Sequence, residues 1–176
     1  MNQILSFDAS TTTIAFAHLI KDDNGKINLL ACDHYNPSKK LDLFPKLSKV
    51  QDFIKSTLNS TNCEDTAIED IILHMNKFTT AQTISTLAIL NRTVGLTIFN
   101  ETGKAPELLN VMKIRHSIKL TKVLPKKEEI PALVETYINC PFPYVYKKKG
   151  GIANESMDRA DAIAVGLCYL KSLWIN

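Results

Sequence analysis

The sequence predicts an α/β domain in which a mixed five-stranded sheet carries helices on both faces. Three observations lead to this fold class: three β-rich runs open the chain, helical and short apolar segments then alternate, and the last long segment is a helix that is apolar almost all round. This order of elements is typical of two helical layers packed on one sheet. A chain of 176 residues is long enough for one sizeable core, so we expect a single domain over residues 1–176.

The first third of the chain predicts an antiparallel meander of three strands. Met1–Phe7 is an apolar strand that ends at Asp8, Thr13–Ile20 is a second β-rich run, and Lys26–Tyr35 is a third. The Asp-Asp-Asn-Gly segment at 22–25 favours a tight hairpin turn between the second and third strands.

The middle of the chain predicts two helices, each followed by a short strand. Apolar residues recur with the helical period over Leu41–Leu58 and again over Thr80–Phe99, which predicts a long, mostly buried second helix. Thr66–Ile72 is short and nearly all apolar, as expected of a central strand covered on both faces. Pro106–Met112 is a fifth short strand.

The last third predicts a Lys-rich connection and then helices. A helix near Lys126–Ile138 is started by Pro125, and Pro131 inside it should shorten or kink it. Ser156 is a candidate cap for a final helix that runs to about Leu173.

Composition excludes several classes of protein. The 45% hydrophobic and 22% charged residues are those of an ordinary globular chain rather than a disordered one. No apolar stretch is long enough for a membrane span, and the N-terminus lacks the pattern of a secretory signal, so we expect a cytoplasmic protein, in the host cytoplasm if a phage encodes it. The four cysteines are widely spaced, which indicates reduced thiols rather than zinc. A net charge of +3 permits DNA binding without arguing for it.

Two acids stand at or inside predicted strands. Asp8 ends the first strand, where an aspartate can simply satisfy the backbone of a turn. Glu69 lies within an apolar strand, where burying an acid is costly unless it is paired, hydrogen-bonded or bound to a metal. Asp70 should point to the opposite face of the sheet and can simply be solvated.

Two further acids open the final helix. Asp158 and Asp161 are three residues apart, which puts both on one face in about the first turn. Acids also favour helix N-termini for electrostatic reasons alone. The following segment 162–167 is apolar almost all round, so Asp161 should lie near the edge of the core. A nuclease that uses two Mg²⁺ ions roughly 4 Å apart needs several carboxylates that converge on one spot, and these four acids are the candidates.

Three segments resemble the RuvC family of Holliday junction resolvases, within the RNase H-like superfamily. They are Ile4–Ser10 (ILSFDAS), Thr66–Ile71 (TAIEDI) and Met157–Ala164 (MDRADAIA), and the last is the most specific. The resemblance implies an RNase H-like fold and an endonuclease that requires Mg²⁺, with Mn²⁺ as a substitute. It also implies a homodimer that nicks opposing strands of four-way junctions, flaps or forks. The metal-binding acids that it implies are Asp8, Glu69, Asp158 and Asp161.

Two positions depart from the bacterial pattern of this family. Ser10 stands where bacterial members have a glycine, and Ile72 stands where they have an aromatic residue that helps to open base stacking. Ile72 itself would then open the junction, or one of its neighbours His74, Met75 and Phe78 would. The departures fit phage-type members better, which tend to accept varied branched DNA.

Basic residues follow the predicted fifth strand, where family members place lysines near the scissile phosphate. Lys127 matches best by position, and it would steady the phosphate. The other basic residues of this region are Arg115, Lys119, Lys122 and Lys126. Such a cluster would neutralise DNA phosphates independently of sequence, although Lys runs are also common at solvated helix starts.

Two more segments are candidate DNA contacts. Lys77 and Phe78 follow the strand that carries Glu69, where family members also touch DNA, and Phe78 is either a stacking residue or a helix staple. Lys147, Lys148 and Lys149 precede the acidic helix and can contact an outgoing DNA arm or form a solvated loop.

Two other functions compete with a junction nuclease. The segment Asp8–Thr11 loosely resembles the first phosphate loop of the actin and sugar-kinase fold, but that architecture normally needs two domains. A DNA-binding or regulatory module could keep the fold without chemistry, and the presence of all four acids argues against it. In the nuclease, Asp8 and Asp161 would bridge or anchor the metals, and Glu69 and Asp158 would complete their coordination.

Overall fold

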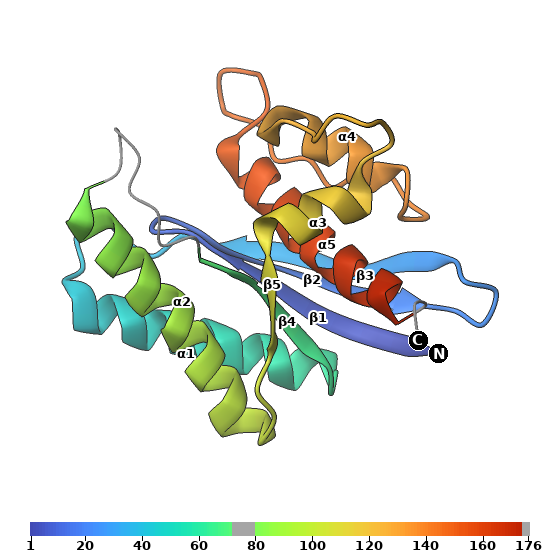
Figure 1. Ribbon diagram of the computed structural model, residues 1–176. Helices are drawn as coiled ribbons and strands as arrows, with labels where there is room; N and C mark the ends of the chain where they lie inside the picture. The colour runs from blue at the N-terminus through green and yellow to red at the C-terminus, as the bar shows by residue number, and fades with distance from the viewer. Residues whose placement is uncertain (72–79, 174–176) are drawn as a thin grey trace.

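The computed structural model describes residues 1–71 and 80–173, and its centre is a five-stranded sheet with the order β3-β2-β1-β4-β5 (Figure 1). Strands β1 (Asn2–Ala9), β2 (Ile14–Lys21) and β3 (Ile27–Tyr35) form an antiparallel meander. The turn before β3 is closed by Asp22, whose carboxylate accepts hydrogen bonds from the backbone of Asn24 and Lys26. The predicted meander and its hairpin are confirmed.

Strands β4 (Thr66–Asp70) and β5 (Glu107–Asn110) extend the sheet in parallel with β1. The crossovers that lead to them are α1 (Leu43–Thr61) and α2 (Ala81–Thr102), as predicted. Strand β5 is shorter than predicted because the Asn110 carboxamide accepts a hydrogen bond from the Met112 backbone and starts a helix there.

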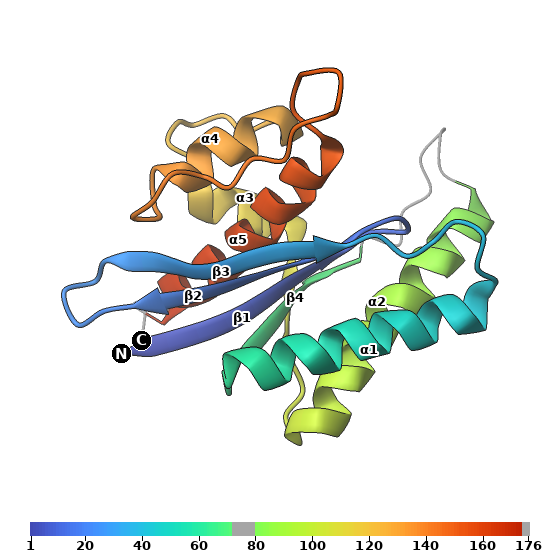
Figure 2. The ribbon, with the colours of Figure 1, turned by 180° about the vertical axis from the view of Figure 1, so that it is seen from behind.

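Helices cover both faces of the sheet, which confirms the predicted fold class. Helices α1 and α2 lie on one face, whereas α3 (Val111–Ile118), α4 (Ile130–Glu135) and α5 (Asn154–Ser172) lie on the other (Figures 1 and 2). Side chains of β1 alternate between the two layers: Leu5 and Phe7 join the core under α1 and α2, and Ile4 joins the core under α5. Within the described ranges 1–71 and 80–173, no helix is long and apolar enough to cross a membrane.

Three details of the last third differ from the sequence prediction. Helix α3 occupies part of the predicted Lys-rich connection, because Ile114 and Ile118 lie one turn apart and are both buried. The predicted helix near 126–138 is shorter: a 3₁₀ turn over Lys127–Glu129 precedes α4, and Pro131 stands in the first turn of α4, where a proline is tolerated. Ser156 does not cap α5; its hydroxyl accepts from the Val145 N–H at 2.8 Å instead.

Helix α5 approaches β1 closely through small residues. The Ser6 hydroxyl donates to the carbonyl of Ala162 in α5 at 2.7 Å and lies 3.1 Å from the carbonyl of Ala17 in β2. A Cβ added to Gly166 would stand 2.7 Å from the Ser6 Oγ and 2.6 Å from the Leu19 Cδ1 atom. This contact fixes the distance between α5 and β1.

Replacing Gly166→Ala is therefore expected to lower the free energy of unfolding by about 1–3 kcal/mol, because the new methyl group overpacks the contact. The gain of up to about 1 kcal/mol in helix propensity does not offset this. Gly95→Ala in α2 is the matched control, since its Cβ would meet nothing closer than 3.4 Å. Urea denaturation of both variants measures the difference, and equal stability of the two would contradict this account of the contact.

Candidate metal centre

Three aspartates meet where the end of β1 faces α5. Asp8 lies on the same face of β1 as Ser6, which already contacts α5. One carboxylate oxygen from each of Asp8, Asp158 and Asp161 can be chosen so that all three lie within 4.8 Å of one another. Asp8 and Asp158 are only 9% and 7% exposed, so the cluster is largely removed from solvent. The sequence prediction that these three acids converge is thus supported by the geometry.

The position of the two α5 acids argues against a purely helical role. Helix α5 begins at Asn154, so Asp158 and Asp161 lie beyond its first turn rather than in it. The electrostatic benefit of an acid at a helix N-terminus falls off within that turn. Desolvating two acids at this depth is costly unless cations or hydrogen bonds compensate. Their placement therefore indicates that compensating positive charge lies close to both acids.

Glu69 lies beside this cluster, at the end of β4. It is on the α5 face of the strand. The charge of Glu69 raises the pKa of Asp8, and the charge of Asp161 raises the pKa of Glu69. Its backbone carbonyl accepts a hydrogen bond of 2.8 Å from the carboxamide of Asn91, a buried residue of α2. Asp70 points to the opposite face, as predicted, but it is ion-paired with Arg92 of α2 at 2.9 Å rather than simply solvated.

A lysine ammonium already bridges two of the acids. Lys127 Nζ lies 3.3 Å from an oxygen of Asp158 and 3.2 Å from an oxygen of Asp161. The segment before it is held by Arg115, whose guanidinium donates to the Pro125 carbonyl at 2.7 Å. Among the predicted basic residues, Lys127 is thus the one that contacts the acids in the described part of the chain, and Arg115 supports its approach.

The acids strongly perturb one another. Burial, followed by the charges of Asp161, Glu69 and Asp158, raises the pKa of Asp8 well above its ordinary value. Burial, and then the charge of Asp161, raises the pKa of Glu69 to about 7. Burial acts to lower the pKa of Lys127, but the neighbouring carboxylates outweigh burial and raise it. A site of this kind favours a bound cation, because added positive charge relieves the repulsion.

The raised pKa of Glu69 predicts a pH-dependent stability in the presence of chelator. A carboxyl group whose folded-state pKa is raised stabilises the fold below its unfolded value of 4.5, and this contribution is lost as pH rises through about 7. Glu69→Gln should match the wild type below that window and exceed its free energy of unfolding by on the order of 3 kcal/mol above it. Thermal denaturation across pH 4–8 measures the difference. Glu64→Gln, at an exposed acid, is the control; a difference for Glu69→Gln that does not vary with pH would contradict the burial of its charge.

The other basic residues predicted to contact DNA lie on two segments outside the acid cluster. Lys122 and Lys126 are exposed and Lys119 is partly exposed, all on the segment between α3 and the 3₁₀ turn. Lys147, Lys148 and Lys149 are exposed in a turn that precedes α5. Among the described residues, no hydrogen bond or ion pair joins the side chains of these lysines to the acid cluster. The predicted contacts Lys77 and Phe78, and the predicted wedge residues Ile72, His74 and Met75, lie outside the described residues.

Some residues that shape the site were not predicted to do so. Ser10, which replaces the glycine of the bacterial pattern, closes the turn between β1 and β2: its hydroxyl accepts from the Thr13 N–H at 2.9 Å. Asn91 is one position of the helical pattern over Thr80–Phe99. A polar residue on the apolar face of that helix is the sequence feature that could have indicated its role. Arg159 binds His34 and the Pro143 carbonyl, contacts between distant segments that sequence spacing does not reveal.

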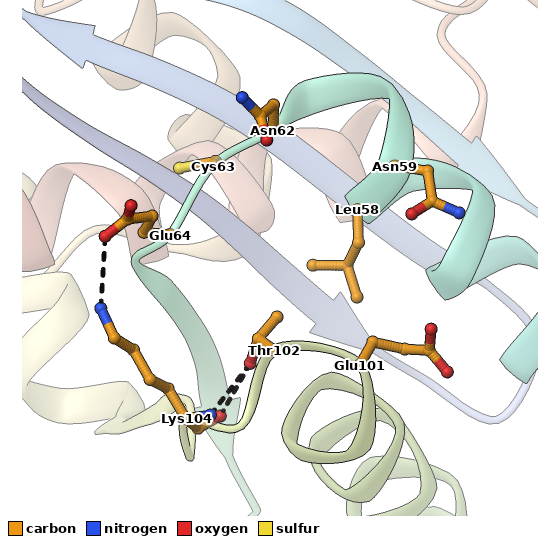
Figure 3. Close-up of a pocket in the computed structure, with 8 residues that line it drawn as sticks. All are labelled: Leu58, Asn59, Asn62, Cys63, Glu64, Glu101, Thr102 and Lys104. Carbon is orange, nitrogen blue, oxygen red and sulfur yellow. Dashed lines mark hydrogen bonds and ion pairs between the residues drawn. The ribbon is translucent and has the colours of Figure 1, made fainter.

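A cavity of about 480 Å³ lies at the end of β4 opposite the acid cluster, between the ends of α1 and α2 (Figure 3). It holds an exposed ion pair of 3.5 Å between Lys104 and Glu64. Its acids Glu64 and Glu101 do not form a metal-binding group with a third acid or histidine among the described residues. This end of the molecule therefore offers control positions for tests of the acid cluster.

The chemistry of the acid cluster fits a hard divalent cation. Mg²⁺ and Mn²⁺ prefer oxygen ligands, and carboxylates from two or more elements are their usual protein ligands. Asp8, Asp158 and Asp161 offer such oxygens at one point, with Glu69 beside them. No cysteine or histidine joins the group in the part of the chain that the structure describes, which disfavours zinc.

Comparison with solved structures shows the same fold in several Holliday junction resolvases. The chain is similar to Thermus thermophilus RuvC in complex with a Holliday junction substrate, with a TM-score of 0.73 at 14% identity over 98% of this chain and 96% of that chain. It is similar to the yeast mitochondrial Holliday junction resolvase Ydc2, with a TM-score of 0.69 at 11% identity over 97% and 78%. It is also similar to the fowlpox virus resolvase in complex with Holliday junction DNA, with a TM-score of 0.55 at 15% identity over 97% and 98%.

These likenesses confirm the predicted fold, the RNase H-like fold of RuvC-type resolvases, over nearly the whole described chain. No protein-family model matches the sequence, and no curated protein matches it. At identities of 11–15% the likeness is one of fold, and a shared fold does not by itself define a function.

Proposed function

We propose that this protein is a Mg²⁺-dependent endonuclease that nicks four-way DNA junctions and related branched DNA. The observation that carries the proposal is the convergence of Asp8, Asp158 and Asp161, with Glu69 beside them, in a fold shared with junction resolvases. Phosphodiester hydrolysis needs charge neutralisation at the phosphate and an activated water, and a buried cluster of carboxylates is the usual protein frame for both.

The residues of the chain have distinct parts in this proposal. Asp8, Glu69, Asp158 and Asp161 would hold Mg²⁺, or Mn²⁺ in its place, and the bound metal would supply an activated water and neutralise the phosphate. Lys127 sits at the rim of the acids with its side chain about half exposed, so its ammonium can turn from the acids to a non-bridging phosphate oxygen. Arg115 positions this lysine through the Pro125 carbonyl.

The branched substrate is proposed from the fold and from surface charge. Three of the similar proteins are Holliday junction resolvases, two of them solved with junction DNA. Exposed lysines lie on two sides of the acid cluster, on the segment that leads to Lys127 and on the turn at 147–149. Such residues would contact the phosphates of different DNA arms without reading their sequence.

The test is an end-labelled four-way junction and a linear duplex of matched sequence, each incubated with Mg²⁺, with Mn²⁺ and with chelator. Metal-dependent paired nicks in the junction, with the duplex spared, are expected. Cutting of both substrates would indicate a less selective nuclease. An intact junction in every lane, with the junction bound, would overturn the proposal in favour of a binding module.

The active form is proposed to be a homodimer, since two opposing strands must be cut. Helix α2 has an outward row of apolar side chains at helical spacing, formed by Ile89, Leu96 and Phe99, with Leu96 57% exposed. Exposed apolar rows of this kind are typical of surfaces that bind a protein partner. We propose that this row pairs with the same row of a second copy.

Replacing Leu96→Glu should therefore give a monomer, because two buried carboxylates would face each other across the pair. Light scattering coupled to size-exclusion chromatography measures the mass, and the expected change is a halving. Leu30→Glu on β3 is the matched control, since Leu30 is 53% exposed on a different element. A wild-type protein that is already monomeric at micromolar concentration would contradict the dimer.

A further inference from the structure

A cavity of about 700 Å³ opens directly beside the acid cluster. Asp158 lines it, so the cavity and the proposed metal centre share a wall. Its other walls come from the β1–β2 turn, the connection that follows β3, and the segment before α5. A volume of this size is in the range that accommodates a small ligand such as one nucleotide.

One wall of the cavity is a small hairpin, which stands above the start of α5 in Figure 1. Tyr146 and Ile152 pair across it, and the Lys147 N–H donates to the Gly151 carbonyl at 2.9 Å. Gly150 has a φ of +87°, which closes the turn in a conformation that other residues rarely adopt. The hairpin therefore holds Tyr146, Lys147 and Lys148 at the cavity rather than leaving them on a loose loop.

The walls of the cavity are tied together by hydrogen bonds between distant segments. The Ser156 hydroxyl binds both the N–H and the carbonyl of Val145. The Asn36 carboxamide donates to Glu155 at 3.1 Å and so joins the connection after β3 to the first turn of α5. These contacts fix the width of the cavity independently of the acid cluster.

The cavity combines an aromatic surface with separated charges. Tyr146 is 67% exposed and ends a row of rings that begins at the buried Phe142 and continues through Tyr144, with centroid distances of 4.7 and 6.2 Å. Lys147 and Lys148 supply positive charge on the same wall, and Glu155 places negative charge at the start of α5. A ligand with a planar ring and a phosphate would match this arrangement, with its phosphate on the lysine side.

We propose that this cavity binds one unpaired nucleotide of the DNA strand next to the phosphate that is cut. The base stacks on Tyr146, and its phosphate is bound by Lys147 and Lys148. This inference rests on the proposed nuclease function, because the strand would enter the cavity from the metal centre past Asp158. It assigns to the hairpin a role in holding the strand at a junction where base pairing is interrupted.

The test measures binding, in Ca²⁺, to a set of four-way junctions. Each junction carries a single abasic site, placed at one of the two nucleotides on either side of the mapped nick. Tyr146→Ala should weaken binding of the intact junction about tenfold, as expected for loss of one base stack. It should leave binding unchanged when the abasic site is at the stacked position, and Tyr146→Phe should bind like the wild type. Phe44→Ala removes an aromatic ring on α1 that is also exposed, at 79%, and is the control.

A second arm uses a six-nucleotide single strand, with and without an abasic site, which requires neither a branch nor cleavage. The same dependence on Tyr146 in the single strand would support nucleotide binding in the cavity even if no junction is cut. Failure of the nucleotide site can therefore be distinguished from failure of the proposed nuclease function. The double variant Lys147→Ala, Lys148→Ala should weaken base-containing and abasic strands equally and reduce the salt dependence of binding. Equal effects of Tyr146→Ala on base-containing and abasic DNA, or no effect on either, would overturn the inference.

Discussion

Asp161→Asn is expected to lower the rate of junction cleavage at least about a thousandfold while junction binding is retained. The side chain keeps its shape but loses the charge that would hold a metal, and a metal supplies several kcal/mol of transition-state stabilisation. Binding should be equal or slightly tighter, because one negative charge near the DNA phosphates is removed. Single-turnover cleavage in Mg²⁺ and binding in Ca²⁺ separate the two effects.

The matched control for this variant is Asp52→Asn, an exposed acid of α1 that is ion-paired with Lys49. It should cleave and bind like the wild type. Loss of binding by Asp161→Asn with a proportionate loss of cleavage would assign Asp161 a role in the fold or in DNA contact rather than in the chemistry. Because its neighbour Ala162 accepts the Ser6 hydrogen bond, a thermal denaturation curve of the variant is needed to exclude displacement of α5.

Lys127→Ala is expected to slow cleavage by about 10²–10³-fold, the usual effect of removing one group that stabilises charge in a transition state. The same variant should bind Mn²⁺ more tightly than the wild type, because the ammonium that lies 3.2–3.3 Å from Asp158 and Asp161 competes with a metal for these acids. Opposite changes in metal affinity and in rate would distinguish a catalytic lysine from one that merely neutralises the acids.

Two further variants make the Lys127 result interpretable. Lys127→Arg should restore part of the rate, since a guanidinium can also bind a phosphate oxygen. Lys104→Ala at the opposite end of β4 removes an exposed lysine that is ion-paired with Glu64, away from the acid cluster. It should change neither the cleavage rate nor the affinity for Mn²⁺. Faster or unchanged cleavage by Lys127→Ala would contradict a role for this side chain at the phosphate.

Much of the fold was predictable because its signals are local. The alternation of side chains along β1 and the helical period of apolar residues in α1 and α2 are properties of neighbouring residues. They were enough to predict the meander, the crossovers and both helical layers. The same alternation predicted that Asp70 points to the face of the sheet opposite Glu69, which the structure confirms. Helix α3 was missed because it is one short amphipathic segment inside a basic stretch.

The remainder of the site depends on contacts between distant segments, and these leave little trace in a single sequence. The ion pairs of Lys127 with Asp158 and Asp161 join positions about thirty residues apart. The loss of the predicted Ser156 cap has the same origin: a serine near a helix start fits a cap by spacing, but a tertiary partner, Val145, takes its hydroxyl. Gly166 likewise shows its importance only once α5 is packed against β1.

The most direct test of the central claim, that Asp8, Glu69, Asp158 and Asp161 form a metal centre, is calorimetric titration of the protein with Mn²⁺. The wild type is expected to bind, and Asp161→Asn to bind at least about tenfold more weakly, since one of the converging carboxylates is lost. Asp52→Asn should bind like the wild type. Failure of the wild type to bind Mn²⁺, or equal affinity in Asp161→Asn, would contradict the metal centre.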